Sequence, residues 1–600
     1  MAAPTTDERA PGPEASESEG RVADRLGPVF MLVPVMFLLV LGWTHRWTEE
    51  DAFLNFRIVD QIRAGHGPVF NVGQRVEVAT SPLWLAMLTA GRTVIPFVRI
   101  EYLALVGGLL LTGLGLWWAQ RGAARMWRTD RVRPAVPLGA VVFAALPASW
   151  EWATSGLENG LSLAWIGALM LVLATFARRD AAPCTARKTV AVGVLVGLGP
   201  LVRPDLTIMS VAALVAVLAT RRPRGATLAW LLGGFLALPV LSELFRMGYY
   251  GILVPNTALA KDAGGTYWSQ GWNYLVDLVA PYWLWVPLVG IAAIAVLLLL
   301  PGRVLPDRLF SKRDVRDRAG PPLVVVLALP VAGVLHALFI VKSGGDYLHA
   351  RLLMPSLFAM LAPFAAVPWR RKLFVPILAI TVWAVVAIVF LRPAIHQSFV
   401  PLTAYDVSEG RELMMKFTRD GRRPILAEDF IFDDGPRAKR LQERGEKALV
   451  SNIQTQPILD ATPQRTTLVS VASGISGYLA GPEVIVHEYN SLADPVGSHM
   501  PPDPNSHPGH RKRKEYPWVL ALTTRPGVTG GFDASRIRAA RAALKCGGLR
   551  DLVASTEDPL DIGTFWSNLT GAVGRTGLVV PRDEFAAERD FCGDDGTIRP

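Results

Sequence analysis

The chain has 600 residues, of which 51% are hydrophobic and only 19% are charged. This balance excludes an ordinary soluble enzyme and predicts a polytopic α-helical membrane protein. The net charge of +10 does not indicate a nucleic-acid partner, because Lys and Arg cluster in short patches between apolar runs, as topology signals do.

The N-terminal tail, residues 1–25, is rich in Pro, Ala, Ser and acidic residues, which predicts a disordered cytoplasmic segment. The apolar run that follows it lacks a small-residue cleavage site and ends in Trp43, His45 and Trp47. A secretory signal would carry such a site. The run is therefore predicted to remain in the protein as a membrane anchor.

Apolar stretches of spanning length continue to residue 391 and define a predicted membrane region, residues 26–391. There are eleven of them, at about 27–44, 100–120, 135–149, 158–177, 188–202, 206–220, 225–246, 277–300, 321–341, 352–368 and 373–391. Residues 82–98 are also apolar, but they carry Arg92 in the middle of the segment. They are predicted to form an interfacial helix rather than a span.

The distribution of positive charge sets the predicted orientation. With the N-terminus inside, most of the Lys and Arg between spans fall in inner loops, as the positive-inside rule requires. Counting residues 82–98 as a span would place the basic segment RGAARMWRTDRVR outside and would reverse every later loop. Eleven spans therefore put the remainder of the chain on the periplasmic side of the plasma membrane.

Composition changes after residue 391, and residues 392–600 are predicted to form a soluble mixed α/β domain in the periplasm. The segments TLVSVAS, EVIVHEY and WVLAL predict short strands. The segment ASRIRAARAALKC has apolar residues at helical spacing and predicts a helix. A polar segment, VGSHMPPDPNSHPGHRKRKEYP, predicts a loop between them.

The cysteines divide according to this topology. Cys184 falls in a predicted inner loop, whereas Cys546 and Cys592 fall in the predicted periplasmic domain. An oxidising compartment favours a disulfide between the latter two. Two unpaired buried thiols are the alternative.

Ionisable and polar side chains gather at the predicted outer helix ends. They are Glu49, Glu50, Asp51, Arg57, Glu151, Glu158, Arg203, Asp205, Tyr249, Tyr250, Asn256, Lys261, Asp262, Asp346, His349 and Arg351. Ionisable groups at membrane depth are costly and usually mark function or pairing. The set predicts a polar cavity in which Arg and Lys bind a lipid phosphate, while a carboxylate assists attack at an anomeric carbon.

Simpler structural interpretations remain open for several of these residues. Arg203 and Asp205 can pair within a turn, and His349 can be an ordinary interfacial histidine. The tyrosines at 249 and 250 are typical of the aromatic belt at a membrane surface. The acidic triplet can be a solvated helix end, and this is the interpretation for Glu49.

The sequence resembles a known family in several quoted segments. An acidic pair after the first span, followed by AFLNFR, AGHGPVFNVGQRVE and TSPLWL, resembles the polyprenyl-phosphate-dependent glycosyltransferases of the GT-C fold. The segments ATSGLENG, LVRPD, FRMGYYGILVPNTALAKD, YWSQG, PYWLWVPLV and GGDYLHAR resemble, more narrowly, the AftB family of terminal β-(1→2)-arabinofuranosyltransferases of the actinobacterial cell envelope. The similarity extends more weakly into GPEVIVHEYNSLADP and the two C-terminal cysteines.

The resemblance implies a donor, decaprenyl-phosphoryl-D-arabinofuranose, and arabinan acceptors in arabinogalactan and lipoarabinomannan. The family's Asp-Asp pair is matched by Glu50 and Asp51, which are the expected catalytic residues, with Asp51 ahead. A β-linked donor and a β-linked product imply net retention. Asp51 could then act as a nucleophile or steer a front-face attack, and both remain open. The C-terminal domain is expected to resemble a carbohydrate-binding module.

The remaining expectations complete this hypothesis. Donor phosphate or sugar would contact Arg57, Arg203, Asp205, Lys261, Arg351 and His349, and acceptor sugar would contact Glu158, Tyr249, Tyr250, Asn256 and Asp346. GT-C enzymes sometimes use a divalent cation, and the acids here could hold one, although no ligand spacing requires it. A monomer surrounded by membrane lipids is expected. The alternatives are a GT-C enzyme for another sugar such as mannose, a lipid-sugar transporter or flippase, and a non-catalytic scaffold.

Overall fold

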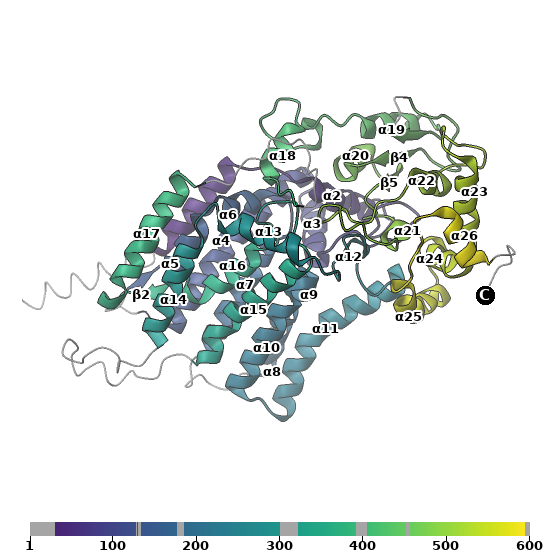
Figure 1. Ribbon diagram of the computed structural model, residues 1–600. Helices are drawn as coiled ribbons and strands as arrows, with labels where there is room; N and C mark the ends of the chain where they lie inside the picture. Colours follow the sequence, from purple (N-terminus) through teal and green to yellow (C-terminus); the bar gives the residue numbers. More distant parts are fainter. Residues whose placement is uncertain are drawn as a thin grey trace, which may run out of the picture.

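The structure is a computed structural model that describes residues 30–127, 129, 134–176, 185–299, 322–391, 405–451 and 456–593. The described part is mostly helical, with a bundle of long helices at one end and a mixed α/β region at the other (Figure 1). The predicted disordered tail, residues 1–25, and Cys184 lie outside the described residues.

The bundle is built from helices of very different lengths. They are Phe30–Thr44, α2 (Glu50–Arg63), α3 (Pro82–Val94), α4 (Ile100–Met126), α5 (Leu138–Ala144), α6 (Pro147–Glu151), α7 (Asn159–Phe176), α8 (Ala186–Gly197), α9 (Gly199–Val202), α10 (Thr207–Arg221), α11 (Gly225–Tyr250), α12 (Asn256–Ala260), α13 (Trp268–Val279), α14 (Trp285–Leu299), α15 (Leu323–Lys342), α16 (Met354–Leu361) and α17 (Phe374–Val389). Strands β1 (Ala135–Val136) and β2 (Val367–Pro368) pair antiparallel beside it.

Within the described residues, five helices are long and apolar enough to cross a membrane: α4, α11, α15, and α10 and α17 with their preceding turns. A sixth crossing results if α6 with its 3-10 turn and α7 count as one span bent by 113°. Gly156 lies at this bend with a positive φ of 83°, a conformation that glycine adopts without steric cost. The chain is therefore a multi-pass membrane protein.

The predicted count of eleven spans remains a prediction. The stretches near residues 135, 188 and 352 form helices of 7, 12 and 8 residues, shorter than a bilayer crossing. Proline accounts for part of this, because Pro147 opens a new helix and Pro363 lies in a 3-10 turn. Helix α3, with 13 residues, is not one of the candidate spans among the described residues, and its position in the membrane interface stays a prediction.

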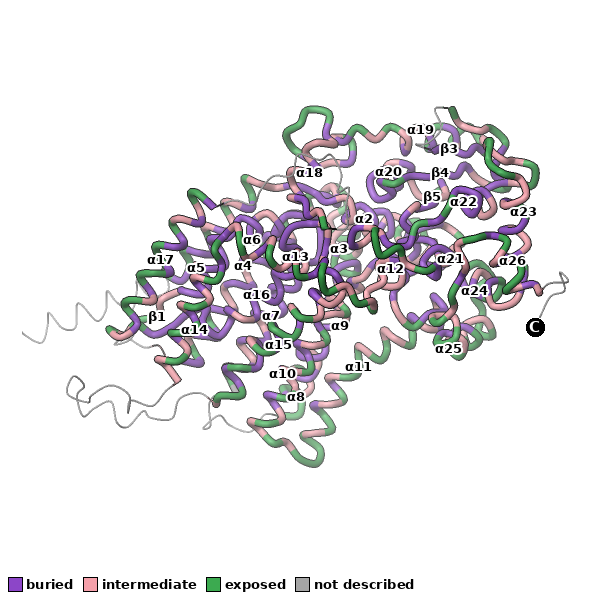
Figure 2. Tube along the Cα trace, in the orientation of Figure 1, coloured by how far each residue is buried: buried purple, intermediate pink, exposed green. Residues whose placement is uncertain are grey.

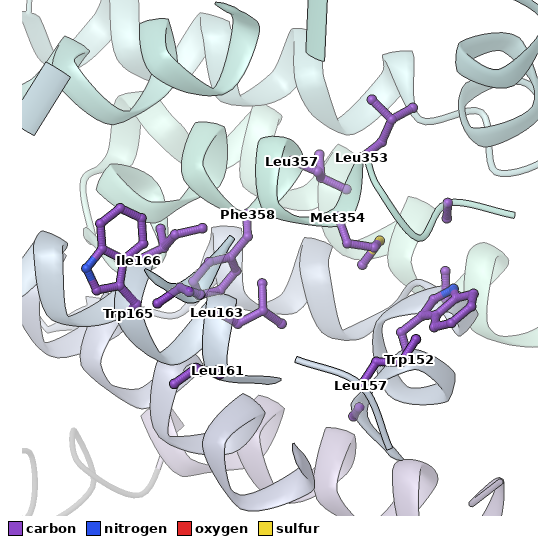
Figure 3. Close-up of a cluster of buried hydrophobic side chains, with 14 of the residues drawn as sticks. Trp152, Leu157, Leu161, Leu163, Trp165, Ile166, Leu353, Met354, Leu357 and Phe358 are labelled. Atoms are coloured by element: carbon purple, nitrogen blue, oxygen red, sulfur yellow. The ribbon is translucent and has the colours of Figure 1, made fainter. Parts of the chain in front are cut away.

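Close packing of α4 on α7 sets the centre of the bundle. Gly108, Gly115 and Gly122 recur at seven-residue spacing on α4 and face α7. A Cβ on Gly160 would lie 2.2 Å from the Gly108 carbonyl oxygen, and one on Gly167 would lie 2.3 Å from the Gly115 carbonyl oxygen. Small residues allow membrane helices to approach at backbone distance. Aliphatic and aromatic side chains of α7 and α16 fill the adjoining core (Figure 3).

The C-terminal region contains a three-stranded parallel sheet in the order β3 (Leu449–Ser451), β4 (Thr467–Ser470), β5 (Ile485–Glu488). Its helices are α18 (Gly410–Lys416), α19 (Asp434–Glu443), α20 (Ser473–Ala480), α21 (Pro495–Ser498), α22 (Tyr516–Thr523), α23 (Ala534–Ala543), α24 (Gly547–Glu557), α25 (Ile562–Thr576) and α26 (Glu584–Cys592).

The strand predictions for TLVSVAS and EVIVHEY are confirmed as β4 and β5, and the helix prediction for ASRIRAARAALKC is confirmed as α23. The strand prediction for WVLAL is wrong, because this run lies in helix α22. A short apolar run does not distinguish a strand from a buried helix, and Pro517 favours a first helical turn.

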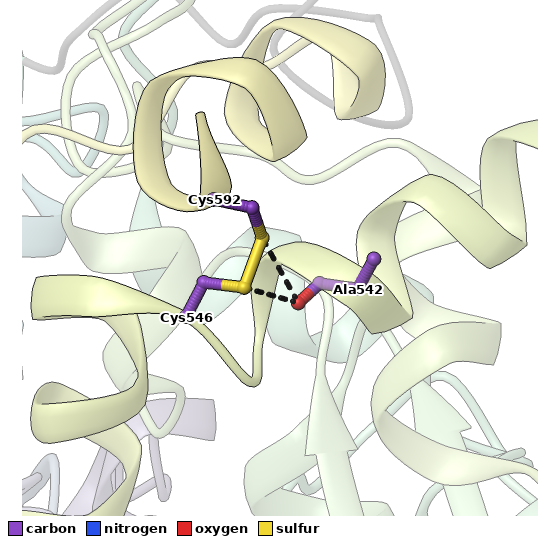
Figure 4. The surroundings of a disulfide bond; sticks show 3 residues. All are labelled: Ala542, Cys546 and Cys592. Atoms are coloured by element: carbon purple, nitrogen blue, oxygen red, sulfur yellow. Dashed lines mark hydrogen bonds between the residues drawn. A yellow bond between two sulfur atoms is a disulfide. The ribbon is translucent and has the colours of Figure 1, made fainter. Parts of the chain in front are cut away.

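A disulfide joins Cys546, at the start of α24, to Cys592, at the end of α26 (Figure 4). Both sulfur atoms lie near the carbonyl oxygen of Ala542, at 3.4 and 3.6 Å. The bond ties α26, the last described helix, to α24 through two cysteines that are 46 residues apart in the sequence. The two cysteines are therefore paired rather than free buried thiols.

Candidate functional site

Helix α2 brings the acidic triplet to the centre of the molecule, where the bundle and the C-terminal region meet (Figure 1). Glu49 is the N-cap of α2, and its Oε2 atom accepts a hydrogen bond from the Asp51 backbone N–H at 2.6 Å. Acidic side chains in the first helical turn are favoured by the helix dipole. The local sequence thus explains why a helix begins here.

An open pocket of about 360 Å³, including its solvent-exposed part, lies beside this helix start. It is lined by Asp51, Leu54, Asn55, Val78, Ala79, Thr80, Leu157, Glu158, Thr257, Lys261, Arg351 and Leu492. Four of the sequence-predicted site residues, Asp51, Glu158, Lys261 and Arg351, are brought together here. They come from four separate segments of the chain, so the fold assembles the site.

Two cations share one oxygen of Asp51. Arg351 donates from Nη1 to Asp51 Oδ2 at 3.1 Å, and Lys261 Nζ lies 3.6 Å from the same oxygen. Burial alone would raise the pKa of Asp51, but Lys261 and Arg351 outweigh it and hold this pKa below its ordinary value. Asp51 is therefore an ionised carboxylate at neutral pH. Asp346 adds a second acid, 3.7 Å from Arg351 Nη1.

Glu49 is not the solvated helix end that the sequence predicts. Its side chain is 0% exposed, and its Oε1 atom has no hydrogen-bond partner among the described residues. Burial and the neighbouring Asp51 carboxylate raise the pKa of Glu49 to about 8. Glu49 is therefore a protonated carboxyl at neutral pH, next to an ionised one.

Glu50 points away from the pocket and toward the C-terminal region. Its Oε1 atom accepts hydrogen bonds from the backbone N–H groups of Gly474 at 2.6 Å and Ile475 at 3.4 Å. These are free donors in the first turn of α20, so the Glu50 side chain caps that helix. Successive residues of a helix point about 100° apart, which explains why Glu50 and Asp51 serve different partners.

Arg203 and Asp205 are paired, as the simpler interpretation of LVRPD held. The Arg203 guanidinium donates to both carboxylate oxygens of Asp205, at 3.0 and 3.1 Å, and to Glu158 Oε1 at 3.0 Å. Asp205 Oδ2 lies 2.9 Å from His336 Nε2, and His336 Nδ1 lies 2.7 Å from Ser356 Oγ. This chain of contacts reaches the pocket only at Glu158, whose orientation it fixes.

His349 belongs to a separate network behind Arg351. Its Nδ1 atom lies 2.6 Å from Asp277 Oδ2 and its Nε2 atom 3.1 Å from the Tyr282 hydroxyl. Burial would lower the pKa of His349, but Glu409 and Asp277 outweigh it and raise this pKa above its ordinary value. These two acids favour the charged form of His349, and His349 does not line the described pocket.

Arg57 donates its hydrogen bonds to backbone carbonyl oxygens and to one side-chain amide oxygen. It is 1% exposed, and its donors reach the carbonyl oxygens of Phe70, Gly477, Gly481 and Val484 at 2.5–2.8 Å. A fifth bond reaches the Asn71 side chain at 3.3 Å. The structure therefore places Arg57 between α2 and the C-terminal region, away from the described pocket residues.

Tyr249, Tyr250 and Asn256 lie outside the described lining of the pocket. Tyr249 and Tyr250 pack edge to face at the end of α11, and the Tyr250 hydroxyl donates to the Pro68 carbonyl oxygen at 2.8 Å. The Asn256 amide donates to the carbonyl oxygens at residues 491, 492 and 494 at 2.8–3.3 Å. Asn256 thereby anchors α12, which carries Thr257 and leads into Lys261 at the pocket.

Several lining residues were not among the candidates predicted from the sequence. Asn55 lies one turn after Asp51 on α2, and its i, i+4 spacing was a usable signal. Thr80 and Thr257 adjoin segments that the sequence singles out. However, nothing in the sequence distinguishes a neutral hydroxyl side chain that lines a pocket from any other. Leu492 comes from the C-terminal region, and nothing in the sequence places it beside α2. Its presence shows that both regions build the pocket.

The pocket residues do not suit a metal ion. Asp51 is already engaged by two cationic side chains, which compete with any cation for the same oxygen. Among the residues that the structure describes, no group of three or more His, Cys, Asp and Glu side chains could hold a metal.

Comparisons with known proteins agree over most of the chain. A model of the AftB family C-terminal domain matches residues 439–584. The chain is 32% identical over 585 aligned positions to the terminal β-(1→2)-arabinofuranosyltransferase of Mycobacterium tuberculosis, covering 88% of this chain and 91% of that protein. It is 28% identical over 622 positions to the protein of the same name in Corynebacterium glutamicum, covering 94% and 89%.

No solved structure matches the chain. Each of the two alignments covers most of this chain and most of the relative. With the matched C-terminal domain, this similarity shows that the chain belongs to the AftB family of terminal β-(1→2)-arabinofuranosyltransferases.

Proposed function

We propose that this protein transfers D-arabinofuranose from decaprenyl-phosphoryl-arabinofuranose to the non-reducing ends of arabinan in arabinogalactan and lipoarabinomannan, forming the terminal β-(1→2) linkage. Membership of the family supports the reaction. The observation that carries the site is the position of Asp51, which shares its Oδ2 with Arg351 and Lys261 in an open pocket.

Lys261 and Arg351 would hold the donor phosphate. Both side chains border the pocket, and Lys261 is the more accessible, with its side chain 32% exposed. A phosphate diester carries one negative charge and can accept the hydrogen bonds that these cations now give to Asp51. A phosphate that took over these hydrogen bonds would lie next to the Asp51 carboxylate. The anomeric carbon of the donor would then be within reach of that carboxylate.

Asp51 would act on the anomeric carbon as an anion. A carboxylate with a lowered pKa is a weak general base, because it takes up a proton reluctantly. It is well suited to stabilise an oxocarbenium-like transition state or to form a glycosyl-enzyme bond. Either role is compatible with net retention, whereas a simple general base in an in-line displacement would invert the configuration.

Glu158 would contact sugar hydroxyls. Arg203 holds its carboxylate in place through a hydrogen bond, and Glu158 also lines the pocket. Asn55, Thr80 and Thr257 add neutral hydrogen-bonding groups around it. A furanose has several hydroxyl groups that point in different directions. Charged and neutral hydrogen-bonding groups around the pocket could each bind a different one of these hydroxyl groups.

The proposed topology of the whole chain is that of a GT-C enzyme with eleven spans. Residues 1–25 would lie in the cytoplasm, residues 26–391 would form the transferase, and residues 392–600 would lie in the periplasm. The distribution of Lys and Arg supports the orientation. The pocket is lined by residues of the bundle and by Leu492 of the C-terminal region, which supports a shared periplasmic location. Leu492 at the pocket supports a role for residues 392–600 as a carbohydrate-binding module that holds the acceptor.

The proposal is tested with the purified full-length protein in lipid vesicles. It receives decaprenyl-phosphoryl-arabinofuranose or decaprenyl-phosphoryl-mannose, together with an arabinan oligosaccharide, and the product linkage is determined. We expect transfer from the arabinose donor only, with a new terminal β-(1→2) linkage. Transfer of mannose, or arabinose in another linkage, would overturn the proposed donor or product.

A further inference from the structure

Helix α25 has a buried face that binds the end of α11. Phe565 packs on Gly248, where an added Cβ would lie 2.2 Å from the aromatic ring. Beyond α11, Arg575 Nε donates to the Gly251 carbonyl oxygen at 2.9 Å, and Thr576 Oγ1 accepts from the Leu253 backbone N–H at 2.8 Å. The C-terminal region is thus fixed to the last turn of a candidate membrane span.

A second face of α25 is apolar and exposed. Ile562 is 80% exposed, Trp566 58% and Val573 61%. At about 100° per residue, these three side chains lie within about 40° of one another, and the centre of their sector is roughly 100° from the centre of the sector that packs on α11. Large exposed apolar side chains grouped on one face mark an interaction surface.

A third sector of α25 is exposed and polar. Ser567 lies on it, about 120° from the centre of the apolar face by the same helical geometry. Helix α25 therefore has one face that packs against the rest of the protein, one exposed apolar face and one exposed polar face. Helices that lie in a membrane interface have this pattern.

The position of α25 at the end of α11 indicates what the apolar face of α25 contacts. Helix α11 has 26 residues and is exposed along most of its length (Figure 2), which for a membrane span means contact with lipid. Leu241, Leu244 and Phe245 are exposed in its last turns, directly before the residues that bind α25. The apolar surface of α25 is therefore next to the lipid-facing surface of α11.

We propose that α25 lies in the membrane interface, with Ile562, Trp566 and Val573 inserted among the lipids of the leaflet where α11 ends. Aliphatic side chains with no hydrogen-bonding group suit acyl chains rather than a glycan, and Trp is favoured at the depth of the headgroups. The C-terminal region is then held to the bundle and to the bilayer at once. This inference does not depend on which residues are catalytic.

The test places a fluorophore at single positions of the full-length protein in nanodiscs. Cysteine variants Trp566→Cys and Val573→Cys on the apolar face, and Ser567→Cys as the matched control on the same helix, are made with Cys184→Ser and labelled with a nitrobenzoxadiazole probe. The oxidised Cys546–Cys592 pair does not react. Discs are prepared with and without lipids that carry a doxyl quencher just below the headgroup.

We expect quenching at 566 and 573 to be at least about twofold stronger than at 567, because only the first two positions face lipid. Equal or absent quenching at the three positions would overturn the proposal. So would an apolar emission at 566 and 573 that doxyl lipids do not quench, because that result would mean that protein, such as a second copy of the chain, covers the face.

Discussion

At the scale of single residues, three adjacent carboxyl groups have three different roles. Glu49 caps α2 and is buried, Glu50 caps α20, and Asp51 faces the pocket between two cations. The burial of Glu49 and the cations beside Asp51 move their pKa values in opposite directions. Opposite shifts in neighbouring acids are a common feature of functional sites.

Replacing Lys261 tests the proposed phosphate contact. Lys261→Ala removes one charge-assisted hydrogen bond, which contributes about 1.5–3 kcal/mol. We expect the KM for the lipid donor to rise about 10-fold or more, with a smaller change in kcat, because the contact is made in both the ground and transition states. Steady-state kinetics in vesicles measure this, with Lys342→Ala as the control. An unchanged KM would remove Lys261 from the phosphate site.

The raised pKa of Glu49 predicts a dependence of stability on pH. In the unfolded chain this carboxyl ionises near its ordinary pKa of 4.5, whereas in the folded protein it keeps its proton to about pH 8. The folded state therefore binds more protons across this window, so the Glu49 contribution to stability falls as the pH rises through it.

Glu49→Gln should remove that dependence, because the amide stays neutral and can still accept from the Asp51 N–H. We expect the melting temperature of the variant, relative to the unsubstituted protein, to be higher at pH 8 than at pH 5. Tryptophan fluorescence during heating measures it. The same difference at both pH values would contradict a raised pKa for Glu49.

At the scale of elements, the interface between α2 and α20 determines where the pocket forms. Arg57 binds carbonyl oxygens in and after α20, and Glu50 caps the same helix. Both contacts hold the C-terminal region against the helix that carries Asp51. The charges of Arg57 and Glu50 were recognisable in the sequence, but their partners are about 420 residues away. Periodicity and spacing report local structure and contain no such long-range contact.

Arg57→Gln distinguishes a structural role from donor binding. The change leaves several buried carbonyl oxygens without a donor, and each such loss costs about 1–3 kcal/mol. We expect a clearly lower melting temperature in detergent, whereas Arg63→Gln, at the exposed end of α2, should change it little. If Arg57→Gln kept the melting temperature and raised only the KM for the donor, Arg57 would be a ligand of the donor instead.

At the scale of the whole molecule, the sequence predicted what depends on charge and hydropathy. A multi-pass helical membrane protein, a mixed α/β C-terminal region and the gathering of Asp51, Lys261, Arg351 and Glu158 all follow from apolar runs and from charges at their ends. Features that depend on tertiary packing were not predictable. The helical state of WVLAL and the separation of His349 from the pocket are examples.

The central claim is that Asp51, and not Glu50, is the reacting carboxylate. The most direct measurement compares Asp51→Asn with Glu50→Gln in the vesicle assay with the arabinose donor, with membrane insertion and melting temperature checked for both. Each change replaces a carboxyl group by an amide and keeps the shape of the side chain. We expect Asp51→Asn to abolish transfer and Glu50→Gln to retain most of it, with both proteins inserted normally. Full activity of Asp51→Asn, or loss of activity only in Glu50→Gln, would contradict the proposed site.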